Sequence, residues 1–338
     1  MNVQPSRDAI LTRLEDADPA TRQLALIELE EVVVDPDGEL IGALVRLVED
    51  PDATVRALAI ARLDDLGDPR GVPGILRALE DACDEVRRAA RAALRDLRGE
   101  GVATRLIEAL ESAGPAAREA VIVALREHKD ERAIDVLTAA VRDPSADVRR
   151  EAVISLAYLR QPETVETLRA SLADTEPAVR RVALGALALF KSPELLSDFL
   201  SALDDDDWQV RREATIVLSR TRSPEAVPAL VRALSDVYWQ VKKEAATALG
   251  QLGTPSAILP LTELLASDVP DVRKAAASAL GELRARSSVP ALGALANDDP
   301  DAEVRKAAQR SLRAISEPCP ASQIGRPIAE DGRLPSSR

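Results

Sequence analysis

The chain has 338 residues and a mass of 36.2 kDa, enough for two ordinary domains, but it contains only two residues each of Trp, Tyr and Phe, one His and two Cys. This composition excludes a large aromatic core, and the widely separated Cys83 and Cys319 give neither a disulfide framework nor zinc-ligand spacing. With 44 basic and 57 acidic residues, the formal net charge is −13, which disfavours general binding to nucleic acids or membrane surfaces. No apolar stretch approaches the roughly 20 residues of a membrane span, and the N-terminus lacks the apolar block of a signal peptide, so we expect a cytoplasmic protein.

The dominant feature of the sequence is an internal repeat of 31 residues. Its copies align without a gap on a small or apolar residue that is followed by Arg or Lys, at Val55, Val86, Ala117, Val148, Val179, Val210, Val241 and Val272. One further copy precedes them at Thr21 and another follows at Val304, which makes ten copies. The extra length after the first copy falls in the loop between Val34 and Gly38.

Within each copy, a short apolar pattern comes first. In several copies its start is marked by a proline, which is favoured in the first turn of a helix because its missing N–H would be unpaired there, at Pro69, Pro162, Pro193, Pro224 and Pro255. A turn follows, and most copies mark it with an aspartate five residues before the central residue, at Asp50, Asp81, Asp143, Asp174, Asp205, Asp236 and Asp299.

A longer helix is predicted after the turn. Counting the central residue as position 0, position +4 is small in nearly every copy, position +8 is Leu in all ten copies, and position +11 is mostly large and apolar. At 100° per residue these positions fall within an arc of about 80°, which is typical of a helix with one narrow apolar stripe. The small residue at +4 allows a neighbouring helix to approach closely. Each copy is therefore predicted to be a helix pair.

The pattern D-P-x-x-x-V-R-x-x-A-x-x-A-L-G-x-L at the centre of each copy resembles the HEAT repeat, in particular the short bacterial type of phycobilisome-lyase-like proteins. The resemblance covers residues 5–316. It implies an all-α fold in which about ten helix pairs stack into a right-handed α–α superhelix, a solenoid that offers an extended surface rather than a closed pocket. The remaining residues, 317–338, contain four Pro and no apolar period, and are predicted to be a disordered tail.

Two charged positions recur in the long helix. Position +1 is Arg or Lys in all ten copies and lies at the margin of the apolar stripe, so we expect a structural ladder to the aspartates of nearby turns. Position +2 points away from the stripe and forms a basic row of Arg88, Arg150, Arg181, Arg212, Lys243, Lys274 and Lys306. Because glutamates follow several of these residues, the row is either a solvated ridge or a docking strip for an acidic partner segment.

The aromatic residues are distributed unevenly. Trp208 and Trp239 are 31 residues apart, both at position −2, and Tyr238 adjoins the second. Each Trp stands four residues before a cation, so ring and charge share a helix face. Small residues at +9 suggest a shallow groove that runs past a shelf made of the two indoles. The predicted partner-binding residues are Trp208, Arg212, Tyr238, Trp239, Lys243, Arg181 and Lys274, and the alternative is that each Trp only covers its own helix pair.

Catalytic interpretations find little support in the sequence. HEAT-repeat deoxyhypusine hydroxylases hold an iron pair with His-Glu dipeptides, whereas the one histidine here, His128, is followed by Lys129. No catalytic residue, metal site or cofactor site is therefore predicted, and Cys83 is expected to be a spectator thiol.

We accordingly expect a non-catalytic scaffold or assembly factor that grips another protein on the inner face of the solenoid. The resemblance leaves open a bilin-lyase-like accessory protein that acts on a tetrapyrrole-carrying subunit. Nucleic-acid binding, as in HEAT-like DNA glycosylases, is opposed by the surplus of acidic charge.

Overall fold

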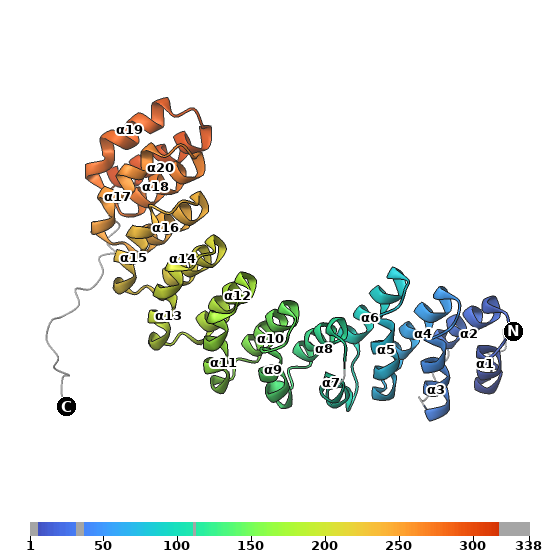
Figure 1. Cartoon of the computed structure of the whole chain (residues 1–338). Helices are drawn as coiled ribbons and strands as arrows, with labels where there is room; N and C mark the ends of the chain where they lie inside the picture. Colours follow the sequence, from blue (N-terminus) through green and yellow to red (C-terminus); the bar gives the residue numbers. More distant parts are fainter. Residues whose placement is uncertain (1–5, 32–36, 111–112, 318–338) are drawn as a thin grey trace, which may run out of the picture. The chain divides into compact units, whose positions relative to one another are not determined.

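The computed structural model describes residues 6–31, 37–110 and 113–317, and in these segments every regular element is a helix (Figure 1). The chain forms two compact units, Met1–Leu195 and Leu196–Arg338. Of the predicted disordered tail, residues 317–338, only Glu317 is described, and Cys319 and most of the loop before Gly38 also lie outside the described residues.

The described part of the first unit contains six helix pairs, each made of an odd-numbered helix and the even-numbered helix that follows it. Their bounds are α1 (Arg7–Leu14), α2 (Pro19–Glu31), α3 (Gly38–Leu47), α4 (Ala53–Leu66), α5 (Val72–Ala78), α6 (Asp84–Asp96), α7 (Val102–Leu110), α8 (Pro115–His128), α9 (Ile134–Ala140), α10 (Ala146–Leu159), α11 (Val165–Ala170) and α12 (Pro177–Leu187).

The described part of the second unit contains four more pairs. Their bounds are α13 (Leu196–Ser201), α14 (Trp208–Thr221), α15 (Val227–Ala233), α16 (Trp239–Leu252), α17 (Ile258–Glu263), α18 (Pro270–Glu282), α19 (Val289–Asp298) and α20 (Ala302–Ser316). The prediction of an all-α array of ten helix pairs is confirmed for the described residues.

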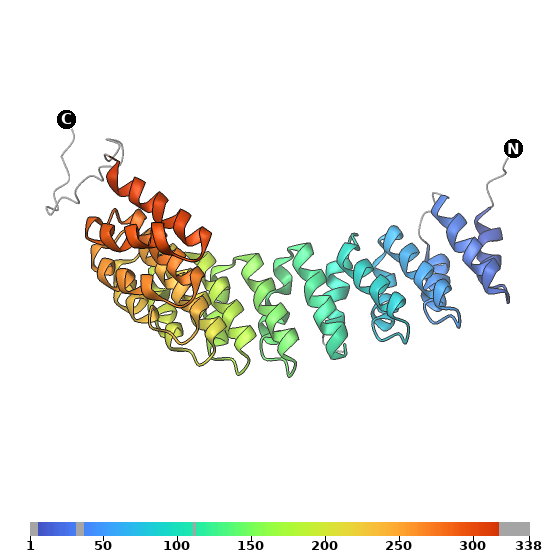
Figure 2. The same ribbon diagram turned by 90° about the horizontal axis from the view of Figure 1, so that it is seen from above.

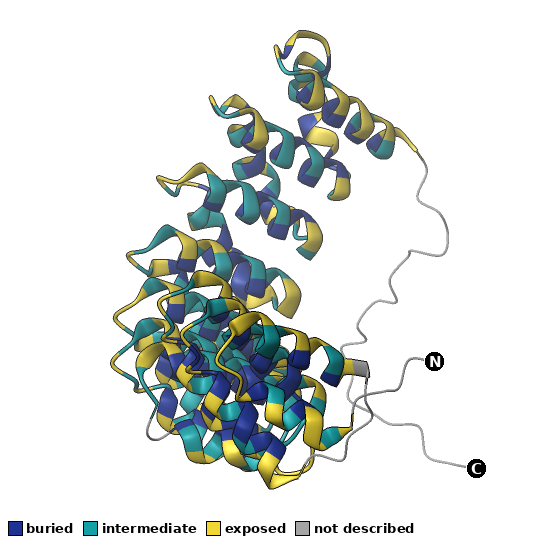
Figure 3. Cartoon of the chain, turned by 90° about the vertical axis from the view of Figure 1, so that its right-hand side faces the viewer, coloured by how far each residue is buried: buried dark blue, intermediate teal, exposed yellow. Residues whose placement is uncertain are grey.

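Within each unit the helices form two layers. Each odd-numbered helix packs against the even-numbered helix that follows it, and consecutive even-numbered helices pack against one another, from α2 to α12 and from α14 to α20 (Figures 1 and 2). Buried residues lie where helices meet, and exposed residues lie on the turns and on the outer sides of the helices (Figure 3). Within a unit, each helix pair therefore contacts mainly the pairs next to it, as expected of a solenoid.

The apolar stripe of the even-numbered helices forms the core, as predicted. In α4, Val55, Ala59 and Leu63 are fully buried, and the equivalent residues of the other even-numbered helices are nearly all buried. Removing one such Leu side chain from water contributes roughly 1.5–3 kcal/mol, and the small residue between Val and Leu allows the adjacent helix to come close. Repetition of these contacts builds the core.

The five prolines predicted to start short helices do not begin the α-helix itself. Pro69 begins a 3₁₀ turn (Pro69–Gly71) that leads directly into α5, rather than the first turn of the α-helix itself. The same arrangement precedes α11, α13, α15 and α17. The side chain of Asp68 accepts a hydrogen bond from the Arg70 backbone N–H at 2.8 Å, which closes this turn.

The predicted Arg–Asp ladder is confirmed. The Arg56 guanidinium donates to both carboxylate oxygens of Asp81 in the next pair, at 2.7 and 2.9 Å, and to the carbonyl oxygen of Asp50 in its own turn, at 2.7 Å. These hydrogen bonds from Arg56 hold the pKa of Asp81 below its usual value. Equivalent ion pairs are Arg22–Asp50, Arg118–Asp143, Arg149–Asp174, Arg211–Asp236 and Arg273–Asp299.

The ladder changes at two places. In the second unit, Lys242 replaces the arginine and Ser267 replaces its aspartate, so both members of one rung differ. In the first unit, Arg87 pairs with Asp84 of its own helix. The residue at the position of its ladder aspartate, Ser112, lies outside the described residues.

Candidate protein-binding surface

The predicted site residues are divided between the two units. Arg181 lies on α12 in the first unit, and the other six lie on α14, α16 and α18 or at the start of these helices. Trp208 and Trp239 are the first residues of α14 and α16, and Tyr238 is the N-cap residue of α16. The aromatic residues therefore lie at the edge formed by the turns within helix pairs.

Three consecutive residues in the second of these turns are exposed. Val237 is 90% exposed, Tyr238 44% and Trp239 37%, whereas Trp208 is half-buried. We refer to Trp208, Val237, Tyr238 and Trp239 as the aromatic patch. Six other large apolar side chains of the described residues are exposed, but only here are three of them consecutive.

Local hydrogen bonds hold the turns that carry the patch. The Asp207 carboxylate caps α14 by accepting from the backbone N–H groups of Gln209 and Val210, at 2.8 and 3.3 Å. The Asp236 carboxylate accepts a hydrogen bond from the Tyr238 backbone N–H at 2.8 Å, and it also accepts one from the Arg211 guanidinium. The rung between α14 and α16 thus positions the aromatic residues on both sides of it.

The contact between the aromatic rings differs from the prediction. Trp208 stacks on Tyr238, with ring centroids 5.5 Å apart and an interplanar angle of 15°, instead of lying beside Trp239. The Arg211 guanidinium carbon lies 5.6 Å from the centre of the same Tyr238 ring. Equivalent sequence positions did not predict this contact, because the residue that reaches Trp208 from the next turn is the N-cap residue of α16, one position earlier in the repeat.

The basic row is not a uniform solvent-exposed strip. Arg212 is exposed but pairs with Glu244 of the next even-numbered helix at 3.3 Å, and Arg150 pairs with Asp147 at 2.6 Å. Lys243, Lys274 and Arg181 are half-buried. Because neighbouring helices pack closely, residues at +2 approach acidic residues of the same or the next helix, which supports the interpretation as a charged structural ridge.

The predicted groove along position +9 is filled. Gly250 and Gly281 are buried, and a Cβ added at Gly250 would lie 2.9 Å from the Cα of Ala279 in the next helix. A Cβ added at Gly281 would lie equally close to the Cα of Ser311. The glycines at these two positions therefore serve close helix packing.

A pocket of about 460 Å³ adjoins the aromatic patch and shares Val237 with it. Its polar lining comes from two consecutive turns, from α14 and from the end of α15, namely Asp204, Asp205, Asp206, Arg211, Arg232, Ser235 and Asp236. Arg211 is engaged by Asp236 and by the carbonyl oxygens of Asp205 and Asp206. The carboxylates outnumber the guanidinium groups, so this side of the patch is acidic.

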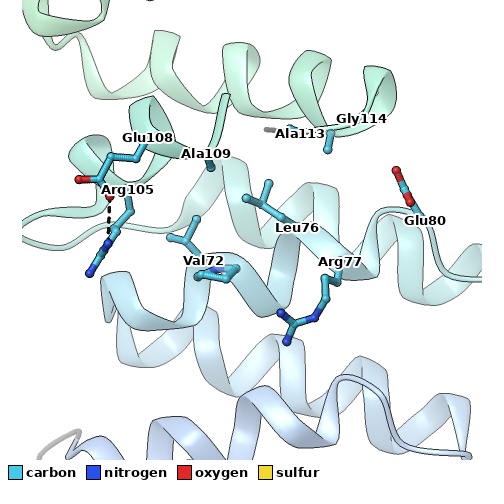
Figure 4. Close-up of a pocket in the computed structure, with 11 residues that line it drawn as sticks. Val72, Leu76, Arg77, Glu80, Arg105, Glu108, Ala109, Ala113 and Gly114 are labelled. Carbon is cyan, nitrogen blue, oxygen red and sulfur yellow. Dashed lines mark hydrogen bonds and ion pairs between the residues drawn. The ribbon is translucent and has the colours of Figure 1, made fainter. Parts of the chain in front are cut away.

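A second pocket, of about 400 Å³, lies in the first unit between α5 and α7 and was not predicted (Figure 4). Figure 4 shows Val72 and Leu76 of α5 facing Ala109 of α7, and Arg105 pairs with Glu108 at the rim at 2.9 Å. The available signal was the turn before α8, where Gly114 replaces the polar residue found in most other copies.

The residues considered for chemistry lie apart from both pockets. His128, at the end of α8, is half-buried, and burial followed by the nearby Arg98 lowers its pKa. Cys83 is the N-cap residue of α6 and is half-buried. Among the described residues, no three His, Cys, Asp or Glu side chains are grouped as metal ligands would be. No helix in this part of the chain has both the length and the apolarity to span a membrane.

Comparisons with solved structures agree with this architecture. YibA from E. coli is 20% identical, with a TM-score of 0.52, and the match covers 80% of this chain and 99% of that one. Kap95p and Kap121p are each 16% identical, with TM-scores of 0.59 and 0.61 over 91% of this chain, which spans 49% and 41% of their lengths. At these identities the likeness shows the fold alone. No curated protein matches the chain in sequence.

A family model described as HEAT repeats matches residues 7–95, 72–157, 103–181, 135–197, 166–242 and 232–313. The matched segments overlap and together extend over nearly all of the described helices. The model is that of HEAT repeats in general, so the phycobilisome-lyase-like subtype stays a prediction. From the helix pairs, the ladder and this match, the chain belongs to the HEAT-repeat family.

Proposed function

We propose that this protein is a non-catalytic protein-binding scaffold or assembly factor, and that it contacts its partner through the aromatic patch. The observation that carries the proposal is the exposure of Val237, Tyr238 and Trp239 beside the Trp208–Tyr238 stack. Protein interfaces draw much of their binding energy from Trp and Tyr side chains that become desolvated on contact. A fold stabilised only by its own core gains little from leaving such residues in water.

The fold is compatible with this role. A solenoid presents adjacent turns and helix ends as one extended surface, so a partner can contact several units at once. Kap121p, which has the same fold, has been solved bound to Pho4p and bound to Nup53p. In those proteins the fold binds other proteins, and we infer the same general use here.

Two finer predictions have less support than the aromatic patch. An acidic partner segment would have to displace Glu244 from Arg212, and the edge that carries the patch is itself acidic. No feature of the described residues favours a bilin-carrying subunit over any other protein. We therefore place the contact at the aromatic patch and not at the basic row.

The test compares the protein with a variant in which Trp208 and Trp239 are both replaced by Ala. Proteins from the native source that bind the unsubstituted chain and are lost from the variant identify the partner. Titration calorimetry with the purified partner should then show an affinity at least about tenfold lower for the variant, or roughly 1.4 kcal/mol.

Two further variants separate binding from folding. Tyr158→Ala removes an exposed aromatic side chain elsewhere, on α10, and should leave partner binding unchanged. Val237→Ser alters a side chain that is almost fully exposed, so it should weaken partner binding without lowering the unfolding temperature. Unchanged binding of both the double-Trp variant and Val237→Ser would contradict the proposal.

A further inference from the structure

We propose that the segment recognised by the aromatic patch is basic: an extended stretch of the partner in which Lys or Arg residues stand on both sides of an apolar residue. This inference rests on the proposed function of the patch. It names the chemistry of the partner, which the repeat pattern alone does not.

The first observation is the order of side chains along the turns. Position −4 of the repeat is Asp206, Val237 and Asp268 in three successive turns of the second unit, and all three residues are exposed. The repeat places equivalent turns side by side. The apolar Val237, with Tyr238 next to it, is therefore flanked by a carboxylate in the preceding turn and another in the following turn.

The second observation is that the acidic charge on one side of the patch is not neutralised. Asp204 and Asp206 are exposed and form no ion pair with other described residues. The adjoining pocket of about 460 Å³ is lined by these two residues together with Asp205 and Asp236. Of its cations, Arg211 is already held by Asp236, at 2.7 Å, which leaves Arg232 at the pocket rim.

A cationic side chain suits this surface in two ways. Its charge is attracted by the carboxylates of Asp204 and Asp206, and its aliphatic part can cover Val237 while the charged end stays near the pocket. A Lys or Arg can also lie over the exposed ring of Trp239, which attracts a cation, whereas the Tyr238 ring already contacts Trp208 and Arg211. An acidic segment would meet like charges on both sides of Val237.

The spacing of the turns sets the spacing in the partner. Packed helices lie about 8–10 Å apart, and a chain in the extended polyproline II conformation advances about 3.1 Å per residue and presents every third side chain to the same side. A cation facing one turn would therefore stand three positions before the apolar residue facing the next, with two residues between them. The expected pattern is a cation, two spacer residues, an apolar residue, two spacer residues and a second cation.

Intrinsic fluorescence provides a direct test, because both tryptophans of the chain belong to the aromatic patch. The probe is the blocked heptapeptide Lys-Ser-Gly-Leu-Gly-Ser-Lys, titrated into the full chain at low salt. We expect a saturable change in tryptophan fluorescence that weakens as salt is added. The same peptide with Glu in place of both Lys should bind at least tenfold more weakly, and the version with Ser in place of Leu should also bind less tightly.

Matched variants locate the charge. Asp206→Asn combined with Asp268→Asn should reduce affinity for the basic peptide at least fivefold. Asp135→Asn combined with Glu163→Gln removes two exposed carboxylates from α9 and the turn before α11 in the first unit, and should leave the affinity unchanged. Equal binding of the Lys and Glu peptides, tighter binding of the Glu peptide, or no fluorescence response to the Lys peptide would overturn the inference.

The inference and the proposed function can fail separately. If the native partner is lost on substitution of the tryptophans but still binds the Asp206→Asn/Asp268→Asn variant, the patch is an interface and the basic segment is wrong. If substitution of the tryptophans and of Val237 leaves the partner bound, the proposed function fails too. A shift in oligomeric state caused by Val237→Asp would assign the patch to a second copy of the chain and overturn the basic segment.

Discussion

At the scale of single residues, the ladder arginine combines several hydrogen bonds in one side chain. Arg56 donates to Asp81 in the next helix pair and to the carbonyl oxygen of Asp50 in its own turn. Both side chains of the Arg56–Asp81 ion pair are largely buried. Arg56→Ala should therefore lower the free energy of unfolding by about 2–3 kcal/mol in urea denaturation, because Asp81 is left without its partner.

Arg88→Ala is the matched control, since Arg88 is an exposed arginine at position +2 of the following copy, on α6. Its substitution should lower the free energy of unfolding by less than about 0.5 kcal/mol. The Arg56 contribution should also depend on pH. The pKa of Asp81 is lower in the folded state than in the unfolded chain, so the stabilisation is present above about pH 4 and is lost as the pH falls below that value. Equal losses for Arg56→Ala and Arg88→Ala would contradict the ladder's role.

Asp64 on α4 behaves in the opposite way. Burial, and then the charges of Asp96 and Asp65, raise its pKa to about 6. The folded state therefore binds this proton more tightly than the unfolded chain, and the stabilisation from the protonated form is lost as the pH rises through about 6. Asp64→Asn should stabilise the protein by about 1 kcal/mol at pH 7.5 and by little at pH 4.5. Thermal unfolding at the two pH values measures this, and the exposed Asp135→Asn should show no such difference.

At the scale of helices, two glycines differ in whether a neighbouring helix requires them. Gly281 in α18 packs against α20, where an added Cβ would lie 2.5 Å from the Ser311 hydroxyl oxygen, whereas a Cβ added at Gly293 in α19 would meet no atom within 4 Å. Gly281→Ala should destabilise the protein by about 1–3 kcal/mol through overpacking. Gly293→Ala should stabilise it by about 0.5–1 kcal/mol, because alanine favours the helix. Urea denaturation that gave both variants the same sign would show that this helix contact is looser than described.

At the scale of the whole molecule, the repeat makes one helix pair exchangeable for another. Deleting residues 148–178 removes 31 residues, one period, and places Arg180 where Arg149 stood. Because each helix pair mainly contacts the pairs next to it, the shortened chain should stay soluble, with the same circular dichroism per residue. Deleting residues 148–163 removes half a period and puts apolar positions out of phase, so it should give an aggregating or partly unfolded chain. The reverse outcome for the two deletions would contradict a modular solenoid.

The sequence by itself determined the helix pairs, the apolar stripe and the ladder, because each depends on contacts that recur at a fixed spacing. Val55, Ala59 and Leu63 identify a buried face through helical periodicity alone, and Arg56 and Asp81 recur in register with it. These features need only the geometry of one helix and its repetition.

Only the tertiary structure decided what the irregular residues do. It paired Trp208 with Tyr238 instead of Trp239, filled the predicted groove at Gly281, and engaged Arg212 with Glu244. Each of these depends on which atoms of the next helix pair come within reach, and the offset between neighbouring helices is set by packing along the whole contact. A repeat spacing specifies equivalence between units, but it does not specify the contact between two different positions in adjacent units.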